Sequence, residues 1–419
     1  MTYRRLTNPL KSTLAIATIW IVLLNSAYGF THGAILHTFN GNPDGSPESL
    51  ILDAAGNIYG TAIHGNGSVF KLSPNANGGY DYSALYEFQG GADGAIPVAV
   101  LMDSNGNLFG TTSEGGANSC IGGFGCGTVF ELMPTPSGPW IHTVIYNFGS
   151  FSGDGATPVA GVTLDGAGNL YGTTSGGGTN DEGTAFELSP SAGGWMETIL
   201  HSFSNSGGDG CLPQSPVTLD NQGNLYGMTY ACGSFGAGIV YQLTPTSGGV
   251  WSENILHSFQ GGSDGQGTYS GLTLDSAGNL YGTTVAGGVG PECHLSLGCG
   301  VVFELSPVAG GAWTESILHR FRATTDGAVP YAAPVFDASG RLYGTTSEGG
   351  TNGNGVVFRL TPISGGRWLE KTYSFTGLAD GGQPESGVVF DASGFLYGVT
   401  FTGGGQNGKD FGTVYRAKP

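Results

Sequence analysis

The sequence predicts an all-β protein: a seven-bladed β-propeller with four antiparallel strands per blade, whose last blade is closed by the N-terminal strand. Three observations support this prediction. A repeat of roughly 56 residues occurs seven times, each copy contains four strand-like runs, and the two chain ends carry complementary parts of one copy. The composition agrees, because 79 glycines in 419 residues suit a fold with many tight turns.

The repeat is marked by an aromatic–Gly pair, usually within Asn-Leu-Tyr-Gly. The aromatic residues are Tyr59, Phe109, Tyr171, Tyr226, Tyr281, Tyr343 and Tyr397. An Asp six residues earlier opens an Asp-x-x-Gly turn in every copy: Asp53, Asp103, Asp165, Asp220, Asp275, Asp337 and Asp391. Self-similarity of this kind is the signature of a repeat architecture.

Each copy contains four short runs rich in β-branched and aromatic residues. Examples are residues 271–274, 280–284, 127–132 and 197–203. Gly, Pro, Asp and Ser bound these runs, which is typical of short strands. Four such strands per copy predict one propeller blade per repeat. The rival fold, an open β-solenoid, has shorter coils.

The chain ends favour a closed ring. The seventh copy stops after its third run, at residues 412–415, whereas residues 34–39 form a fourth run with no blade before it. We therefore expect residues 35–39 to complete blade seven. Closure would remove an exposed sheet edge.

The first residues resemble a secretory signal peptide. Arg4, Arg5 and Lys11 precede the apolar stretch 14–24, and small residues at positions 27 and 29 predict cleavage before Phe30. The expected organisation is a signal peptide, 1–29, and one propeller, 30–419, that is secreted to the periplasm, the cell surface or the medium. An uncleaved signal anchor is the alternative, and no second membrane segment is expected.

The charge excludes some partners. Without Arg4, Arg5 and Lys11, the 13 basic residues become 10, against 31 acidic ones, a net charge of −21. Nucleic acid and anionic membrane both require a cationic surface, so neither is an expected partner.

The combined motifs resemble the GloVer tandem-repeat proteins of bacteria. The shared pattern is Asp-x-x-Gly-Asn-Leu-Tyr-Gly-Thr-Thr, then Gly-Thr-Val-Phe-Glu-Leu, the Trp-x-Glu run and an Asp-Gly loop, over residues 34–417. The resemblance implies an exported protein and brings no catalytic residues. The Asp-x-x-Gly-Asn-Leu-Tyr element is also similar to turns in other propellers, including lactone-cleaving lyases.

The six cysteines predict three disulfides. Cys120–Cys126 and Cys293–Cys299 each clip an insertion between the second and third runs. Cys211 and Cys232 lie in two loops of one repeat that should emerge on the same face. The alternative, a metal site, would need four converging ligands, so we expect neither metal nor cofactor.

The Asp-Gly loops supply the candidate binding residues. One Asp recurs in every loop: Asp44, Asp93, Asp154, Asp209, Asp264, Asp326 and Asp380. A calcium loop needs several oxygen ligands, whereas each of these loops has a turn composition, so the turn interpretation is favoured. His64, Glu114 and Glu348 are further candidates in loops on the same face.

Two recurring positions have structural interpretations. His37, His201, His257 and His319 share a position that Tyr86, Tyr146 and Tyr373 occupy in other copies. A position that accepts His or Tyr predicts a packed inter-blade site. The recurring Trp residues are likewise expected to pack one blade on the next.

The sequence identifies no catalytic residue or catalytic motif. The first hypothesis is a monomeric, non-enzymatic scaffold that binds protein or glycan on the Asp-Gly face. The alternative is a propeller enzyme, a lyase or hydrolase, with a polar site at the channel mouth. An enzyme should concentrate unmatched polar residues in a few adjacent repeats. Most repeat positions look interchangeable, which favours binding.

Overall fold

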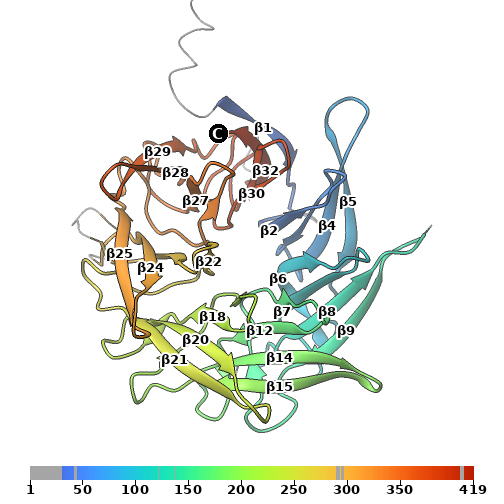
Figure 1. The fold of residues 1–419 in the computed structure, drawn as a ribbon. Coiled ribbons are helices and arrows are strands. Elements are labelled where there is room, and N and C mark those ends of the chain that lie inside the picture. Colours follow the sequence, from blue (N-terminus) through green and yellow to red (C-terminus); the bar gives the residue numbers. More distant parts are fainter. Residues whose placement is uncertain are drawn as a thin grey trace, which may run out of the picture.

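The structure, a computed structural model, describes residues 31–41, 45–120, 122–136, 138–288, 293, 297–405 and 410–419. Seven four-stranded antiparallel sheets are arranged as blades around a central axis (Figure 1). The predicted fold class is therefore confirmed. The expected signal peptide, 1–29, lies outside the described residues.

The blades follow one another in chain order. Blade 1 contains β2 (Pro47–Leu52), β3 (Ile58–Ala62), β4 (Ser68–Pro74) and β5 (Tyr80–Glu87). Blade 2 contains β6 (Ala95–Met102), β7 (Leu108–Glu114), β8 (Thr128–Met133) and β9 (Ile141–Asn147). Blade 3 contains β11 (Thr163–Leu164), β12 (Leu170–Thr174), β14 (Thr184–Ser191) and β15 (Gly194–Ser202). Blade 4 contains β17 (Thr218–Leu219), β18 (Leu225–Met228), β20 (Ile239–Pro245) and β21 (Trp251–Ser258).

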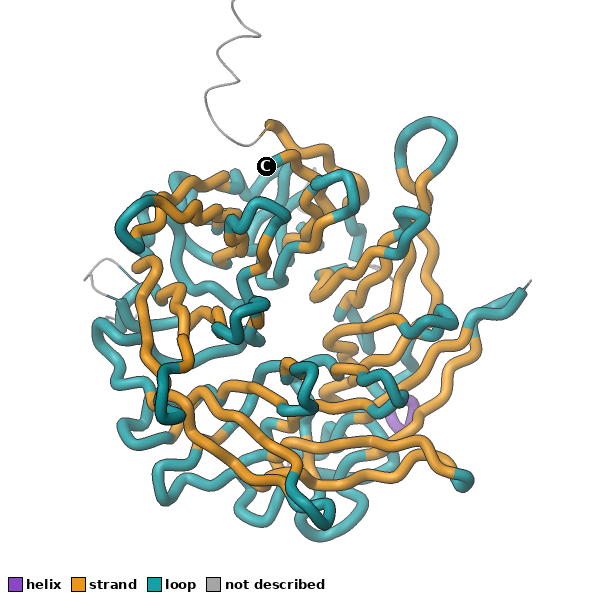
Figure 2. Tube along the Cα trace, viewed as in Figure 1, coloured by secondary structure: helices purple, strands orange, loops and turns teal. Residues whose placement is uncertain are grey.

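The remaining blades repeat the pattern. Blade 5 contains β22 (Thr273–Leu274), β23 (Leu280–Thr284), β24 (Val301–Pro307) and β25 (Trp313–Arg320). Blade 6 contains β26 (Val335–Phe336), β27 (Leu342–Thr346), β28 (Val356–Ile363) and β29 (Arg367–Ser374). Blade 7 contains β30 (Val389–Phe390), β31 (Leu396–Thr400), β32 (Thr413–Lys418) and β1 (Thr31–Thr38). Loops separate nearly all of these strands (Figure 2).

Short elements lie in some Asp-Gly loops and in the loops that pair with them. Two-residue strands pair as β10 (Gly155–Ala156) with β13 (Gly176–Gly177) and as β16 (Gly210–Cys211) with β19 (Ala231–Cys232). A short 3₁₀ turn, η2, spans Gly91–Asp93. No helix in the described part of the chain has the length and apolar character needed to cross a membrane.

The ring closes through its two ends, as the sequence predicts. β1 pairs antiparallel with β32, with Ile35 opposite Tyr415 and His37 opposite Val414 (Figure 1). Because β32 would otherwise present an unpaired edge, this contact removes a site of strand addition.

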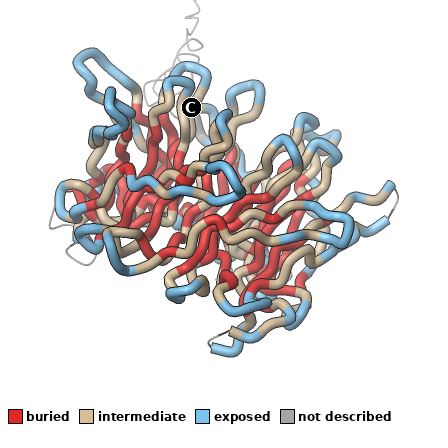
Figure 3. Tube along the Cα trace, turned by 60° about the horizontal axis from the view of Figure 1, so that its bottom comes forward, coloured by how far each residue is buried: buried red, intermediate tan, exposed pale blue. Residues whose placement is uncertain are grey.

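The hydrophobic core lies between neighbouring blades, and the loops are exposed (Figure 3). For example, the fully buried Phe303 of blade 5 shares a cluster with Tyr226 and Met228 of blade 4. The predicted packing role of the recurring Trp residues is confirmed: the ring of Trp251 meets that of Tyr171 in the preceding blade edge to face, 6.2 Å apart.

The recurring Asp-x-x-Gly turn is held by its Asp side chain. In blade 1, Asp53 Oδ1 accepts the backbone N–H groups of Ala55 and Asn57, and Oδ2 accepts hydrogen bonds from the Asn57 side chain and the Tyr59 hydroxyl. Burial raises the pKa of Asp53, but these bonds outweigh it and lower the pKa overall. The motif residues that define the repeat therefore form one turn.

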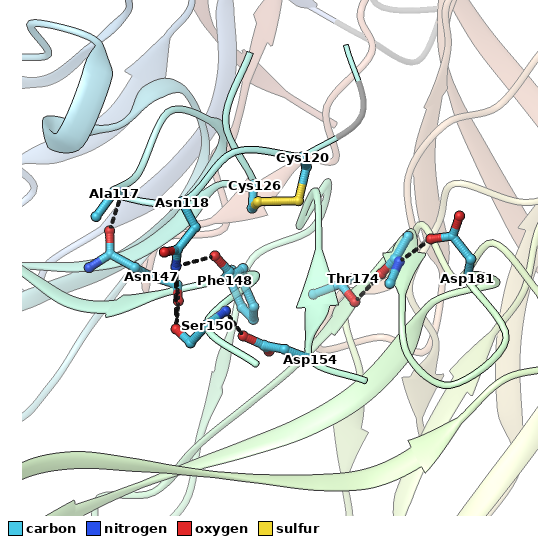
Figure 4. The surroundings of a disulfide bond; sticks show 12 residues. Ala117, Asn118, Cys120, Cys126, Asn147, Phe148, Ser150, Asp154, Thr174 and Asp181 are labelled. Atoms are coloured by element: carbon cyan, nitrogen blue, oxygen red, sulfur yellow. Dashed lines mark hydrogen bonds between the residues drawn. A yellow bond between two sulfur atoms is a disulfide. The ribbon is translucent and has the colours of Figure 1, made fainter. Parts of the chain in front are cut away.

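All three predicted disulfides are present. The Cα atoms are 5.1 Å apart in Cys120–Cys126, 5.3 Å in Cys211–Cys232 and 5.2 Å in Cys293–Cys299. Figure 4 shows the first of these pairs, in a loop that Asn118 anchors through a 2.8 Å hydrogen bond to the carbonyl of Phe148. Cys211 and Cys232 lie on the paired short strands β16 and β19.

Candidate functional site at the channel mouth

The Asp residues of the Asp-Gly loops are bonded within their own loops and blade interfaces. Asp264 accepts the backbone N–H of Gln260 at 2.6 Å and lies 3.3 Å from His257 Nε2. Burial raises the pKa of Asp264. Hydrogen bonds to its carboxylate, of which the one from His257 has the largest effect, outweigh burial and lower the pKa to about 2. The geometry is that of a turn whose carboxylate is already engaged.

The same arrangement recurs at the other described loops. The carboxylates of Asp93, Asp154, Asp209, Asp326 and Asp380 each accept a backbone N–H four or five residues earlier. Each also contacts the preceding His or Tyr: Tyr86, Tyr146, His201, His319 and Tyr373. Asp44 lies outside the described residues.

At most interfaces a Glu of the next blade joins the pair. His201 Nε2 lies 3.2 Å from Asp209 and 3.6 Å from Glu253, which confirms that the recurring His position is an inter-blade site. Burial raises the pKa of Glu253 to about 7, and the pKa of Glu370 at its interface to about 8. Such pairs of carboxyl groups hold a proton near neutral pH.

Three of these interfaces have the composition of a cation site. Within each group the ligand atoms lie within 4.8 Å of one another: His201, Asp209 and Glu253; His257, Asp264 and Glu315; His319, Asp326 and Glu370. Of the groups that the structure describes, these hold the oxygen and nitrogen donors a metal would use. Their His and Asp members already contact one another, which gives them a structural role without a metal.

A cavity of 590 Å³ runs along the central channel, lined by residues at the start of the first strand of each blade or just before it. In each blade the lining begins at the residue that follows the Asp-Gly loop. These seven residues are Glu48, Val98, Val159, Gln214, Tyr269, Tyr331 and Glu385. Because the Asp-Gly loop immediately precedes them, they form a ring at the channel mouth on the Asp-Gly face.

The ring at the channel mouth is chemically asymmetric. Blades 2 and 3 contribute Val98 and Val159, whereas blades 5, 6, 7 and 1 contribute Tyr269, Tyr331, Glu385 and Glu48 in succession. The Tyr269 and Tyr331 rings are stacked with centroids 4.9 Å apart. Tyr230 from blade 4 extends the aromatic group, its ring 5.1 Å from that of Tyr269.

Burial and neighbouring carboxyl groups raise the pKa values of the carboxyl groups of this ring. Burial, and then the neighbouring Glu385, raises the pKa of Glu48 to about 7. Burial, and then Glu348, raises the pKa of Glu385. Burial and the surrounding carboxylates also raise the pKa of Tyr331. Since no Lys, Arg or His is among the described residues that line this cavity, its polar side accepts hydrogen bonds and repels anions.

The remaining sequence candidates share one repeat position but have different surroundings. Glu348 lies close enough to Glu385 and Tyr331 to perturb both, so it belongs to the channel mouth. His64 is exposed and its ring lies 5.1 Å from that of Phe411. Glu114 is half-buried and its backbone carbonyl accepts the Thr112 hydroxyl.

Sequence reasoning missed most of the channel-mouth group. Glu48, Glu385, Tyr269, Tyr331 and Tyr230 were not among its candidates. A signal was available: the residue after the Asp-Gly loop varies from Val to Tyr to Glu, while its neighbours repeat. Unmatched polar residues are thus concentrated in adjacent blades, which the sequence interpretation had not expected.

The chain belongs to the Gloeobacter/Verrucomicrobia repeat family, whose model matches residues 21–221, 119–295 and 292–419. No curated protein matches the chain.

Solved structures with a similar fold include virginiamycin B lyase from Staphylococcus aureus, with a TM-score of 0.53 and 15% identity over 93% of this chain and 99% of that chain. A catalytically inactive variant of that lyase with quinupristin has a TM-score of 0.50 and 17% identity over the same shares. The extracellular domain of a protein assigned to a hybrid two-component system of B. thetaiotaomicron has a TM-score of 0.53 and 14% identity over 93% of this chain and 41% of that chain. These likenesses concern the fold.

Proposed function

We propose that this protein is an exported, monomeric binding propeller that takes a neutral glycan at the channel mouth. The observation that carries the proposal is the asymmetric ring: Tyr269, Tyr331, Glu385 and Glu48 line adjacent parts of a 590 Å³ cavity. Tyr230 lies against Tyr269, and Glu348 is close enough to Glu385 to raise its pKa. The predicted signal peptide, 1–29, and the three disulfides support export.

The chemistry of the ring favours sugars. Carboxylates, phenol oxygens and the Gln214 amide accept or exchange hydrogen bonds, and sugar hydroxyl groups supply the matching donors. Anionic ligands are disfavoured, because Glu48 and Glu385 line the cavity and no cationic residue is among its described lining residues. Glu348 is close enough to contribute to the raised pKa of Tyr331. A concave cavity of this volume can enclose a small saccharide unit, whereas the flat surface of a protein partner could not enter it.

Calorimetric titration tests the proposal: a panel of neutral mono- and oligosaccharides is added to the mature protein, and the heat of binding is measured. Tyr331→Ala and Glu385→Gln should each weaken binding by about tenfold or more, as expected for loss of a buried aromatic contact or a charge-assisted hydrogen bond. Val98→Ala, at the same repeat position in blade 2, is the matched control and should bind normally. Absence of binding by every saccharide, or equal effects of all three variants, would refute the proposal.

A second candidate function is acid–base catalysis at the same mouth, as in a lyase or hydrolase. It is favoured by Glu48, whose pKa of about 7 lets it donate a proton at neutral pH beside a second carboxyl group, Glu385. In that case Glu48→Gln should abolish turnover of a bound saccharide while leaving its affinity nearly unchanged. Unchanged ligand after prolonged incubation with the unmodified protein would leave binding as the function.

A further inference from the structure

A second cavity lies between blades 6 and 7, away from the channel. Its volume is 420 Å³, and its walls are mostly apolar, with Ile35, Val357, Phe375 and Ala417 among them. The side chain of Leu378 is 70% exposed at its edge. None of the channel-mouth residues lines it, so it is independent of the proposed glycan site.

The repeat explains why this interface is hollow. In β14 and β28 the residues that pair with the first Leu of the preceding strand are Leu188 and Leu360, both fully buried. The residue in that register in blade 7 is Ala417, which pairs with Leu396. Blade 7 therefore lacks a core side chain that the other six blades provide, as Leu72, Leu132, Leu188, Leu243, Leu305 and Leu360.

A second truncation falls at the same interface. Blades 3 to 5 carry a Glu four residues before the recurring His of the outer strand, and blade 6, whose outer strand has no bulge, carries one three residues before Tyr373. Each reaches the preceding blade: Glu197, Glu253, Glu315 and Glu370. Blades 1 and 2 have Tyr82 and His142 there, each stacked on a ring of the preceding blade. In β1 this residue is Gly33, which has no side chain.

The polar partners that usually meet the Glu are still present. At the interface of blades 2 and 3, the Tyr146 hydroxyl lies 2.6 Å from Glu197 and 3.1 Å from Asp154. At the interface of blades 6 and 7, Tyr373 donates to Asp380 at 3.0 Å, and both residues line the cavity. The cavity thus combines apolar walls with one polar pair, Tyr373 and Asp380, and small-molecule sites commonly have this composition.

We propose that this cavity binds a small branched or aromatic hydrocarbon that ends in one neutral hydroxyl group. The hydrocarbon body takes the place of the Leu and Glu side chains that blade 7 lacks, and the hydroxyl donates to Asp380 or exchanges a hydrogen bond with Tyr373. An anionic end group is disfavoured beside Asp380, and an ammonium group would lose its hydration against apolar walls.

Ligand-observed NMR with the oxidised mature protein tests the site, using 4-methylpentan-1-ol and its O-methyl ether as probes. The alcohol should bind and the ether should bind at least several-fold more weakly, since it lacks the O–H donor. Ala417→Leu restores the residue of the other blades and should abolish alcohol binding. Ala34→Leu, which adds the same atoms to an exposed position of β1 outside the cavity, should leave binding unchanged.

Two further readouts keep the outcome decisive. Ala417→Leu should raise the thermal midpoint of the free protein, which separates filling of the cavity from misfolding. Tyr373→Phe should weaken the alcohol and leave the ether unaffected. The site is ruled out if the unmodified protein binds neither probe, if alcohol and ether bind equally, or if folded Ala417→Leu still binds the alcohol. Saccharide binding at the channel mouth should be unaffected by Ala417→Leu, so the two proposals fail separately.

Discussion

Replacement of Glu315 by Gln should stabilise the protein at neutral pH and flatten the dependence of its stability on pH. The Glu315 side chain is only 13% exposed and lies 3.7 Å from His257, beside Asp264. Burial, and then the hydrogen bond and charge of Asp264, raises the pKa of Glu315 from 4.5 to about 9. Glu315 is therefore protonated in the folded protein at pH values at which the unfolded chain has released that proton.

The direction and size of the effect follow from linkage. The stabilising contribution of neutral Glu315 is complete below pH 4.5 and is lost as the pH rises through 9. At ~1.36 kcal/mol per pH unit, the cost is about 1 kcal/mol at pH 5 and about 4 kcal/mol at pH 7.5. Gln keeps the shape and the neutral state of protonated Glu at every pH, so the variant avoids this cost.

Thermal unfolding at the two pH values measures the effect. With ~0.8 kcal/mol/K of unfolding entropy for a chain of this length, 4 kcal/mol corresponds to about 5 °C. Glu315→Gln should raise the midpoint by about 5 °C at pH 7.5 and by about 1 °C at pH 5. Glu87→Gln, at an exposed position, is the control and should change neither value appreciably. An equal shift at both pH values, or destabilisation at pH 7.5, would refute the reasoning.

Three other predictions concern the scaffold. Replacing Cys211 and Cys232 by Ala removes a clip across 21 residues and should lower the free energy of unfolding by about 3 kcal/mol, measured by denaturant titration under oxidising conditions; no loss would mean that the pairing of β16 with β19 suffices. Leu305→Ala, at a fully buried position, should cost about 2–5 kcal/mol in the same assay, and a cost below about 1 kcal/mol would contradict the assigned core. Starting the chain at residue 41 removes β1 and should produce concentration-dependent association in light scattering, because the edge of β32 is then unpaired; a stable monomer would show that closure does not protect this edge.

Much of the fold could be predicted from the sequence because it is a repeated local pattern. The Asp53 turn, the strand that follows it and the contact of Trp140 with Tyr59 each depend on residues within one copy or its neighbour. The same local pattern recurs in seven copies, which makes it recognisable in the sequence. The offset between the chain ends predicted the pairing of β1 with β32 for the same reason. Loop positions within single repeats likewise predicted the disulfides.

The candidate sites needed the tertiary structure because they arise where single copies depart from the pattern. Glu48 and Glu385 lie near opposite ends of the chain, and Glu385 raises the pKa of Glu48 only because ring closure makes blades 7 and 1 neighbours. Gly33 and Ala417 are likewise distant in sequence, and together they open a cavity only because β1 pairs with β32. The sequence by itself determined the repeated blade, since local turns and strand patterns specify it. Only the closed ring decided which of the side chains that depart from the repeat line the same cavity, since that depends on contacts between copies distant in sequence.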